Sequence, residues 1–261
     1  MDGVQTVIVL GVVTFALGIL LGFIGAGGAG LTVALLTSAF DLPVHQAIGT
    51  ALAAMVVASV LGGASHFREG NVVGRVGIVA GLGGVAGAAL GARIGQDIPE
   101  TALQIAAGLG LWLLSALVWV RLRYARRLAE AAGVADAVTD LPPERRDAAV
   151  ATLGLAGGAA SAFLGVGMTP FLQLGMLVLL KMPLRLTVGT TMVTLIFISV
   201  SGATSFAAYG DVSTPHLLGL VIGLGPGSFV GARLTGRARG GILRFAVVAT
   251  PFVAGTVLLI P

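Results

Sequence analysis

Two glycine-rich turns are the residues of this chain best suited to chemistry. The first contains Gly25, Gly27 and Gly28, and the second contains Gly165 and Gly167. Each turn lies between two apolar segments, so its backbone N–H groups and the positive end of the following helix would face one point. Such a turn near the middle of a membrane would suit an oxyanion. A plain bend between packed helices would explain the same glycines equally well.

A second pair of motifs places hydroxyl and amide donors six residues after a proline. Pro43 precedes Gly49-Thr50, and Pro183 precedes Gly189-Thr190-Thr191. Proline fits the start of a helix, and the Gly-Thr step could then interrupt that helix and present Thr50, Thr190 and Thr191 to a ligand. The alternative is an unbroken helix in which glycine allows close packing and threonine bonds back to its own helix.

Single polar residues in the apolar segments add two candidates. Thr169 begins the segment after the second glycine turn, and Gln173 follows one helical turn later. Burying a side-chain amide without a partner is costly, which makes Gln173 the strongest polar candidate of this kind. His66 would titrate near neutral pH, but a satisfied or interfacial histidine is the favoured interpretation.

Several classes of site are not predicted. The chain has no cysteine, no HExxH motif and no P-loop, and no acidic residue falls in the middle of an apolar segment. We therefore expect no metal, no cofactor and no catalytic residue. Residues 63–67 are similar to a serine-hydrolase elbow but lack its final glycine, so an intramembrane enzyme is a weak alternative.

The composition is that of a helical membrane protein. The chain is 56% hydrophobic and 10% charged, with a mean hydropathy of +1.02, whereas soluble domains carry about a quarter charged residues. Segments 24–40 and 169–180 are shorter than the ~20 residues of a comfortable crossing, so they are candidate broken or re-entrant helices. Ten apolar segments are predicted, at residues 4–21, 24–40, 48–67, 74–94, 102–120, 148–164, 169–180, 188–208, 215–234 and 242–260.

The second half of the chain repeats the first half 140 residues later. Between residues 23–95 and 163–235, seventeen of seventy-three aligned positions are identical, against about a tenth expected by chance. The predicted organisation is a first five-helix repeat at 1–120, a cytoplasmic linker loop at 121–147 and a second five-helix repeat at 148–261. The linker contains Pro142-Pro143 and is expected to be partly helical through residues 126–132.

Basic residues decide how often the chain crosses the membrane. With ten crossings and the N-terminus outside, fourteen of the fifteen Lys and Arg residues lie in cytoplasmic loops, and Arg93 alone lies outside. With eight crossings and an inside N-terminus, only eight lie inside. The positive-inside rule therefore favours ten crossings. Five crossings per repeat is an odd number, so the two copies are predicted to be inverted. The predicted location is the cytoplasmic membrane, with the linker inside.

A glycine ladder occurs in each repeat. Gly83, Gly87 and Gly91 recur as Gly223, Gly227 and Gly231, and both ladders lead into Gly-Ala-Arg. Small residues at every fourth position favour close helix packing, either within the fold or in a homodimer. The exceptional Arg93 would bind an anion near the outer face or reach the lipid headgroups. The clustered basic residues are interpreted as topology signals and lipid contacts, and nucleic acid is not an expected partner.

The paired glycine turns and Pro-x(5)-Gly-Thr steps resemble those of the sulfite/sulfonate exporter family called TauE/SafE. The resemblance covers nearly the whole chain through its repeat, and it implies a multi-pass permease for small sulfur-containing or other organic anions. The candidate substrate-binding residues of this chain are the turn glycines, the two Gly-Thr steps, Thr169, Gln173 and Arg93. One departure is that Met168 and Pro170 replace Gly28 and Gly30 in the second copy. A passive anion channel of the same architecture stays open, as do the anion, the coupling ion, the direction and the oligomeric state.

Overall fold

The structure is a computed structural model that describes residues 3–25, 29–132, 143–164, 169–238 and 240–259. The described residues form helices joined by short connections, with no strand among them. The ten helices are α1 (Gly3–Ile24), α2 (Ala29–Phe40), α3 (Val44–Arg68), α4 (Gly74–Gln96), α5 (Glu100–Ala132), α6 (Pro143–Phe163), α7 (Thr169–Leu179), α8 (Leu184–Ala208), α9 (Thr214–Arg237) and α10 (Gly240–Leu259). Each of the ten predicted apolar segments therefore corresponds to one helix.

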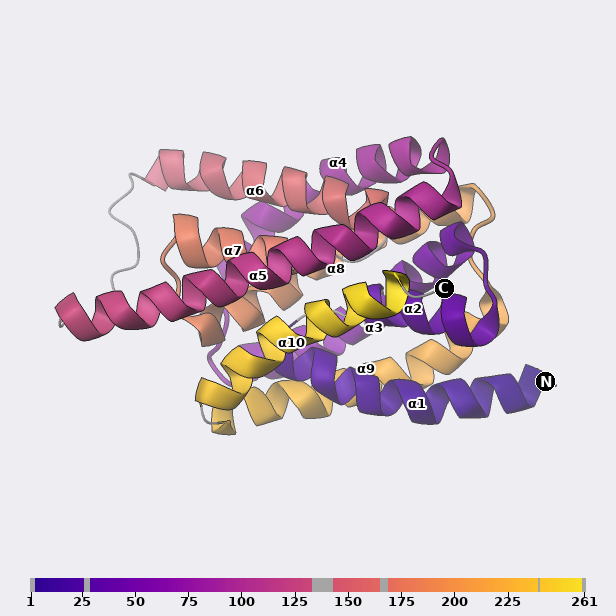
Figure 1. The fold of residues 1–261 in the computed structure, drawn as a ribbon, viewed down its shortest axis with the longest axis horizontal. Coiled ribbons are helices and arrows are strands. Elements are labelled where there is room, and N and C mark those ends of the chain that lie inside the picture. Colours follow the sequence, from indigo (N-terminus) through magenta and orange to yellow (C-terminus); the bar gives the residue numbers. More distant parts are fainter. Residues whose placement is uncertain (1–2, 26–28, 133–142, 165–168, 239, 260–261) are drawn as a thin grey trace.

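The helices lie roughly parallel or antiparallel along the long axis of the molecule (Figure 1). Seven of them, within the described ranges, are long and apolar enough to cross a membrane: α1, α3, α4, α5, α8, α9 and α10. The short helices α2 and α7 have 12 and 11 residues. At 1.5 Å per residue they are each about 16–18 Å long, roughly half of a bilayer core.

Helices from the two halves of the chain exchange partners. α1 packs along α9, and α6 packs along α4. α3 lies against α8, and α5 lies against α10. Under the 140-residue shift α1 becomes α6 and α4 becomes α9, so each cross-half contact has a counterpart.

The glycine ladders lie in these cross-half contacts. A Cβ added at Gly87 would overlap the carbonyl oxygen of Leu155 on α6. A Cβ added at Gly227 would in the same way overlap the carbonyl oxygen of Phe15 on α1. Small residues here let two backbones touch, which is how helices associate without a hydrophobic driving force. The ladders are thus used inside the fold, which leaves the homodimer as an untested prediction.

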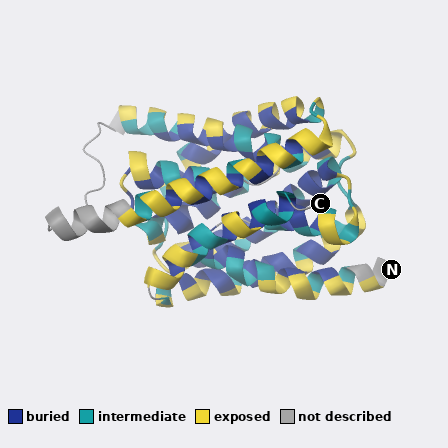
Figure 2. Cartoon of the chain, viewed as in Figure 1, coloured by how far each residue is buried: buried dark blue, intermediate teal, exposed yellow. Residues whose placement is uncertain are grey.

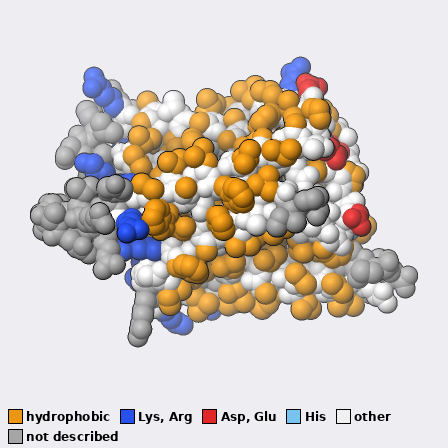
Figure 3. Space-filling view, in the orientation of Figure 1, with side chains coloured by type: hydrophobic (Ala, Val, Ile, Leu, Met, Phe, Trp, Pro, Cys, Tyr) orange, Lys and Arg blue, Asp and Glu red, His pale blue; other side chains and the backbone are white. Residues whose placement is uncertain are grey.

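The surface of the bundle is divided by residue type. Buried residues line the interior, and exposed residues follow the outer faces of the helices (Figure 2). Large exposed side chains such as Ile8, Leu82 and Phe245 are apolar, as a lipid-facing surface requires. Lys and Arg gather mainly at one end of the molecule, and Asp and Glu appear at the opposite end (Figure 3).

Polar contacts show which loops share an end. At the basic end Arg75 binds Asp147 at 2.6 Å, Arg121 donates to the Leu177 carbonyl at 3.3 Å, and Arg185 donates to the Ala238 carbonyl at 2.9 Å. At the acidic end His45 contacts Glu100, and Gln96 donates to Asp211 at 2.8 Å. The start of α6 and the end of α7 therefore lie at the same end.

The predicted linker is largely helical. α5 continues through Ala132 and α6 begins at Pro143, so only residues 133–142 of the linker lie outside the described part of the chain. Residues 121–132 consist mostly of Arg, Leu, Ala and Glu, which are strong helix formers. No helix-breaking residue occurs before Gly133, so α5 continues past residue 120, where the predicted apolar segment ends.

Candidate functional site

Polar side chains from three helices gather at the end of α1, in the buried interior. Its last carbonyl groups have no partners within the helix, and side chains from three other helices bind them. Gln173 on α7 donates from Nε2 to the Ile24 carbonyl at 2.7 Å. His66 on α3 donates from Nε2 to the Gly22 carbonyl at 3.0 Å, and Thr235 on α9 donates from Oγ1 to the Phe23 carbonyl at 2.7 Å.

These three donors change the electrostatics of the first glycine turn. The C-terminal end of a helix carries a partial negative charge of about half an elementary charge, located on its free carbonyl oxygens. Donors on those oxygens compensate part of this charge, and the three side chains are themselves buried, at 0 to 2% exposure. The end of α1 therefore repels an anion less strongly than a helix end whose carbonyl groups have no donors.

Gly25, the first residue after α1, packs closely against the second repeat. Gly25 has φ of +66°, a conformation that glycine adopts without strain. A Cβ on Gly25 would overlap the carbonyl oxygen of Val188, which immediately precedes Gly189 and Thr190 on α8. The first glycine turn and the second Gly-Thr step, two motifs that the sequence predicted separately, are thus in contact.

Both Gly-Thr steps hold a loop from the opposite repeat. The Thr50 hydroxyl accepts from the backbone N–H of Ser213 at 2.9 Å, and the Thr190 hydroxyl accepts from the N–H of Val73 at 2.9 Å. Ser213 and Val73 immediately precede α9 and α4, and they are 140 residues apart. Gly49 and Gly189 allow this approach, because a Cβ there would overlap the carbonyl oxygens of Asp211 and Asn71.

Of the two alternatives for the Gly-Thr steps, the structure has the unbroken helix and not the interrupted one. α3 and α8 run unbroken through both steps, with Pro43 and Pro183 as their N-caps. The glycines serve close approach between segments, and the threonine hydroxyls of Thr50 and Thr190 bind across the repeats. Thr191 is buried and donates back to the Thr187 carbonyl at 2.7 Å, as a helical threonine commonly does.

The short helix α7 contributes two of the predicted residues, and α2 adds one that was not predicted. Thr169 begins α7 and is buried at 1% exposure, one turn before Gln173. In the first turn of α2, Thr32 is buried at 1% exposure with no hydrogen-bond partner for its hydroxyl among the described residues. Each of these short helices therefore begins with a buried hydroxyl close behind a glycine turn.

The remaining predicted site residues divide into two groups. Gly27, Gly28, Gly165 and Gly167 lie outside the described residues. Arg93 is exposed in the last turn of α4, whereas the residues around the end of α1 are buried. The structure therefore does not bring Arg93 into the cluster formed by Gly25, Gln173, Gly189 and Thr190.

Sequence reasoning missed His66 and Thr235 as partners of the α1 end. Their repeat counterparts are Phe206 and Gly95, and the counterpart of Gln173 is Val33. The signal that could have found them is this loss of symmetry, because all three donors occur where the other copy has no side-chain donor. His66 also keeps a second ring nitrogen, Nδ1, that is buried without a partner within the described ranges.

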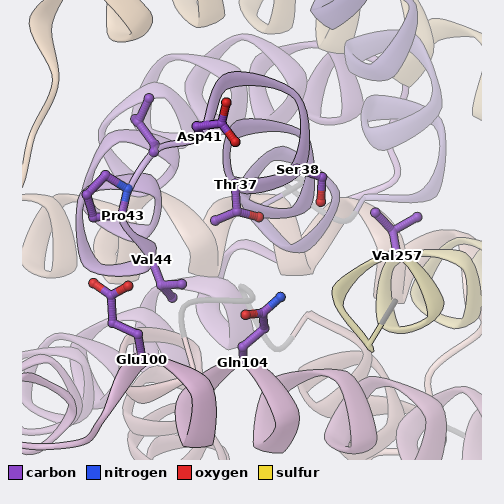
Figure 4. A pocket seen from close by; sticks show the side chains of 9 residues that line it. Thr37, Ser38, Asp41, Pro43, Val44, Glu100, Gln104 and Val257 are labelled. Carbon is purple, nitrogen blue, oxygen red and sulfur yellow. The ribbon is translucent and has the colours of Figure 1, made fainter. Parts of the chain in front are cut away.

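A separate cavity of about 830 Å³ opens at the acidic end. Thr37 and Ser38 on α2 face Glu100 and Gln104 on α5 across it, with Asp41 at its rim (Figure 4). Two carboxyl groups would repel an anion, so this cavity does not match the predicted oxyanion site. No group of metal-ligating side chains occurs among the residues that the structure describes.

Comparisons with known proteins agree with this architecture. Residues 10–258 match the family described as sulfite exporter TauE/SafE. The chain is 37% identical over 247 residues to the probable membrane transporter protein YdhB of Bacillus subtilis, covering 95% of this chain and 98% of that protein. It is 25% identical over 248 residues to the probable membrane transporter protein YjnA of the same organism, covering 93% and 95%. No solved structure matches the chain. The match over nearly the whole length shows that this chain belongs to the TauE/SafE family of membrane transporters.

Proposed function

We propose that this protein is a secondary transporter that exports small sulfur-containing or organic anions, such as sulfite or organosulfonates, across the cytoplasmic membrane. The family description supports this class of cargo, since the matched family is that of a sulfite exporter. The absence of acidic residues from the middle of the apolar segments also suits an anion. Alternating access would come from rocking one repeat against the other.

The proposed topology has ten crossings in two inverted repeats, with the N-terminus outside and the basic end in the cytoplasm. Paired contacts support it, because α1 on α9 and α6 on α4 are equivalent under the 140-residue shift. The contact between Arg121 and the Leu177 carbonyl also supports it. It implies that the linker before α6 and the end of α7 lie on the same face of the membrane, as they do when both helices cross. In the eight-crossing arrangement these two residues would lie on opposite faces.

The proposed substrate site is the first glycine turn together with the starts of α2 and α7. One observation carries this proposal: three buried donors from α3, α7 and α9 bind the carbonyls at the end of α1. The backbone N–H groups of the turn and the positive end of α2 would then face the anion. Gly25, Gly27, Gly28, Thr169 and Gln173 would form the binding surface.

The other predicted site residues have supporting roles in this proposal. The second turn, with Gly165 and Gly167, would bind more weakly, because Met168 and Pro170 replace glycines there. Gly49-Thr50 and Gly189-Thr190 would hold the crossing segments in register, and Thr191 would pack beside α7. Arg93 would attract anions to the outer face.

The test is uptake into proteoliposomes that contain the purified full chain. Sulfite, taurine, sulfoacetate, sulfate and chloride are each offered, with proton and sodium gradients varied. A saturable flux of at least one sulfur anion with counterflow is expected. Absence of saturable flux for every sulfur anion would overturn the cargo, and flux without counterflow would indicate a channel.

The site is tested by replacing Gln173 with leucine. The Ile24 carbonyl would lose its donor, and a buried unpaired carbonyl costs about 1–3 kcal/mol. We expect the kcat/KM of transport to fall by at least about tenfold. Gln104→Leu is the matched control, because Gln104 also donates to a carbonyl, that of Leu258, at 2.9 Å but lies on α5. Equal losses in both variants would contradict the assignment of this site.

A further inference from the structure

A groove between α5 and α10 lies on the side of the bundle and toward its basic end. Its volume is about 780 Å³, and its walls are mostly apolar and aromatic. Trp112, Trp119 and Phe252 line it, with Phe245 75% exposed at its edge. The Trp112 and Phe252 rings stack with their centroids 5.8 Å apart. Aromatic rings of this kind concentrate at the edges of the bilayer core.

Two arginines close the basic end of this groove. Arg123 comes from α5 and lies over the Trp119 ring at 5.0 Å, and Arg244 comes from the first turns of α10. Neither guanidinium has a carboxylate partner within the described parts of the chain. Two guanidinium groups that line one groove without a carboxylate partner in the described part of the chain would attract a phosphate-bearing group at a membrane surface.

The inner lining of the groove offers little competing hydrogen bonding. Ser115 already donates to the Val248 carbonyl at 2.8 Å, and the Trp112 indole donates to the Thr256 hydroxyl at 3.1 Å. Trp112 and Arg123 are eleven residues apart on α5, which separates them by about 16 Å along the helix axis. The groove is therefore an apolar channel of acyl-chain length with a cationic end.

The opposite end of the same helix pair provides an internal comparison. Arg244 corresponds under the 140-residue shift to Gln104, and Glu100 lies one turn away from Gln104. The cationic character is thus specific to the basic end and does not follow from the helix pairing itself.

We propose that this groove binds one anionic phospholipid of the leaflet at the basic end. The headgroup phosphate contacts Arg123 and Arg244, and one acyl chain lies along Trp119 and Trp112. Charge complementarity selects the headgroup, and the aromatic walls hold the chain. The lipid then fills the space between α5 and α10 and holds together helices that belong to different repeats.

The two tryptophans make this proposal directly measurable, because the chain has two Trp residues and both line the groove. The full chain in nanodiscs is titrated with phosphatidylglycerol or phosphatidylcholine brominated on the acyl chains, and tryptophan fluorescence is followed. We expect half-maximal quenching at a phosphatidylglycerol fraction about tenfold lower than for phosphatidylcholine, since each basic residue near an anionic surface contributes several-fold to binding.

Variants separate the groove from general surface charge. Arg123→Gln with Arg244→Gln should remove the preference for phosphatidylglycerol, and the two Lys replacements should keep most of it. The control is the double variant Arg233→Gln with Arg237→Gln, which removes two charges from the last turns of α9. It should leave the preference for phosphatidylglycerol unchanged. Ala116→Phe should fill the groove and reduce quenching by both lipids.

Three outcomes would overturn the proposal. Equal quenching of the native chain by both lipids would show that the headgroup is not selected. Equal loss of preference in the α9 control would assign the effect to overall surface charge. Negligible quenching by either lipid would show that the groove is covered, as it would be by a second copy of the chain.

Discussion

His66 illustrates how one side chain can distinguish two nearly equivalent places. His66 and Phe206 occupy matching positions, since each Cβ lies against the glycine of a Gly-Thr step, at Gly189 and Gly49. Only the imidazole can donate to a helix end, and it does so at the Gly22 carbonyl. Substrate preference is therefore expected to depend on residues where the two repeats differ.

The first prediction replaces His66 with phenylalanine, the residue found at its counterpart. The chain should still fold, because a phenyl ring fits the matching position at Phe206. The Gly22 carbonyl loses its side-chain donor and keeps the Gly25 N–H at 3.3 Å, so the loss is that of one hydrogen bond, about 0.5–1.5 kcal/mol. We expect anion flux in proteoliposomes to fall several-fold while the protein remains monodisperse. His216→Phe is the control, as His216 binds Ser213 at the acidic end. Unchanged flux in His66→Phe would remove His66 from the site.

At the scale of the element, close helix contacts depend on single glycines. Gly87 on α4 faces the Leu155 carbonyl of α6, so any side chain there pushes two backbones apart. We expect Gly87→Ala to lower the free energy of unfolding by about 1–3 kcal/mol, the usual cost of overpacking. Gly74 on the same helix has open space around it, so Gly74→Ala should be neutral or slightly stabilising. Thermal unfolding in detergent measures both, and equal effects would contradict the packing.

A second element-scale prediction concerns the hydroxyl that holds the start of α4. Thr190→Val removes the acceptor for the Val73 N–H and should destabilise the protein by about 1–2 kcal/mol. Thr152→Val is the control, because that exposed hydroxyl donates to its own helix. Thermal unfolding distinguishes the two, and the cross-repeat role requires a clearly larger loss for Thr190→Val.

For the whole molecule, the number of crossings is the property that most needs a direct test. The chain has no cysteine, so single cysteines can be introduced without background. Pro99→Cys lies in the exposed connection before α5, and Gly240→Cys begins α10 with open space around it. Ten crossings place these sites on opposite faces, with Gly240 inside. Eight crossings place both outside, so labelling of both by an impermeant reagent would refute the ten-crossing topology.

Local patterns predicted most of the fold, and long-range contacts supplied what they could not. Apolar segments, their lengths and the 140-residue repeat are visible in neighbouring residues, so each helix was found. The contact between Gly25 and Val188 joins residues 163 positions apart, and no local pattern encodes it. For the same reason, Thr50 and Thr190 were identified as candidates while their partners, Ser213 and Val73, were not. The sequence shows that His66, Gln173 and Thr235 differ from their counterparts in the other copy. Only the structure shows that all three bind the carbonyl groups at the end of α1.

The exchange of α1 and α6 between the two halves has a consequence for biogenesis. α1 is synthesised before α9, yet the surface of α9 against which α1 packs is made about two hundred residues later. Until α9 is made, the face of α1 that will pack on the α9 glycines must remain in contact with lipids or with an insertion chaperone. The first half therefore cannot complete its packing before the second half is made, and α1 reaches its final contacts only after α9 has been synthesised.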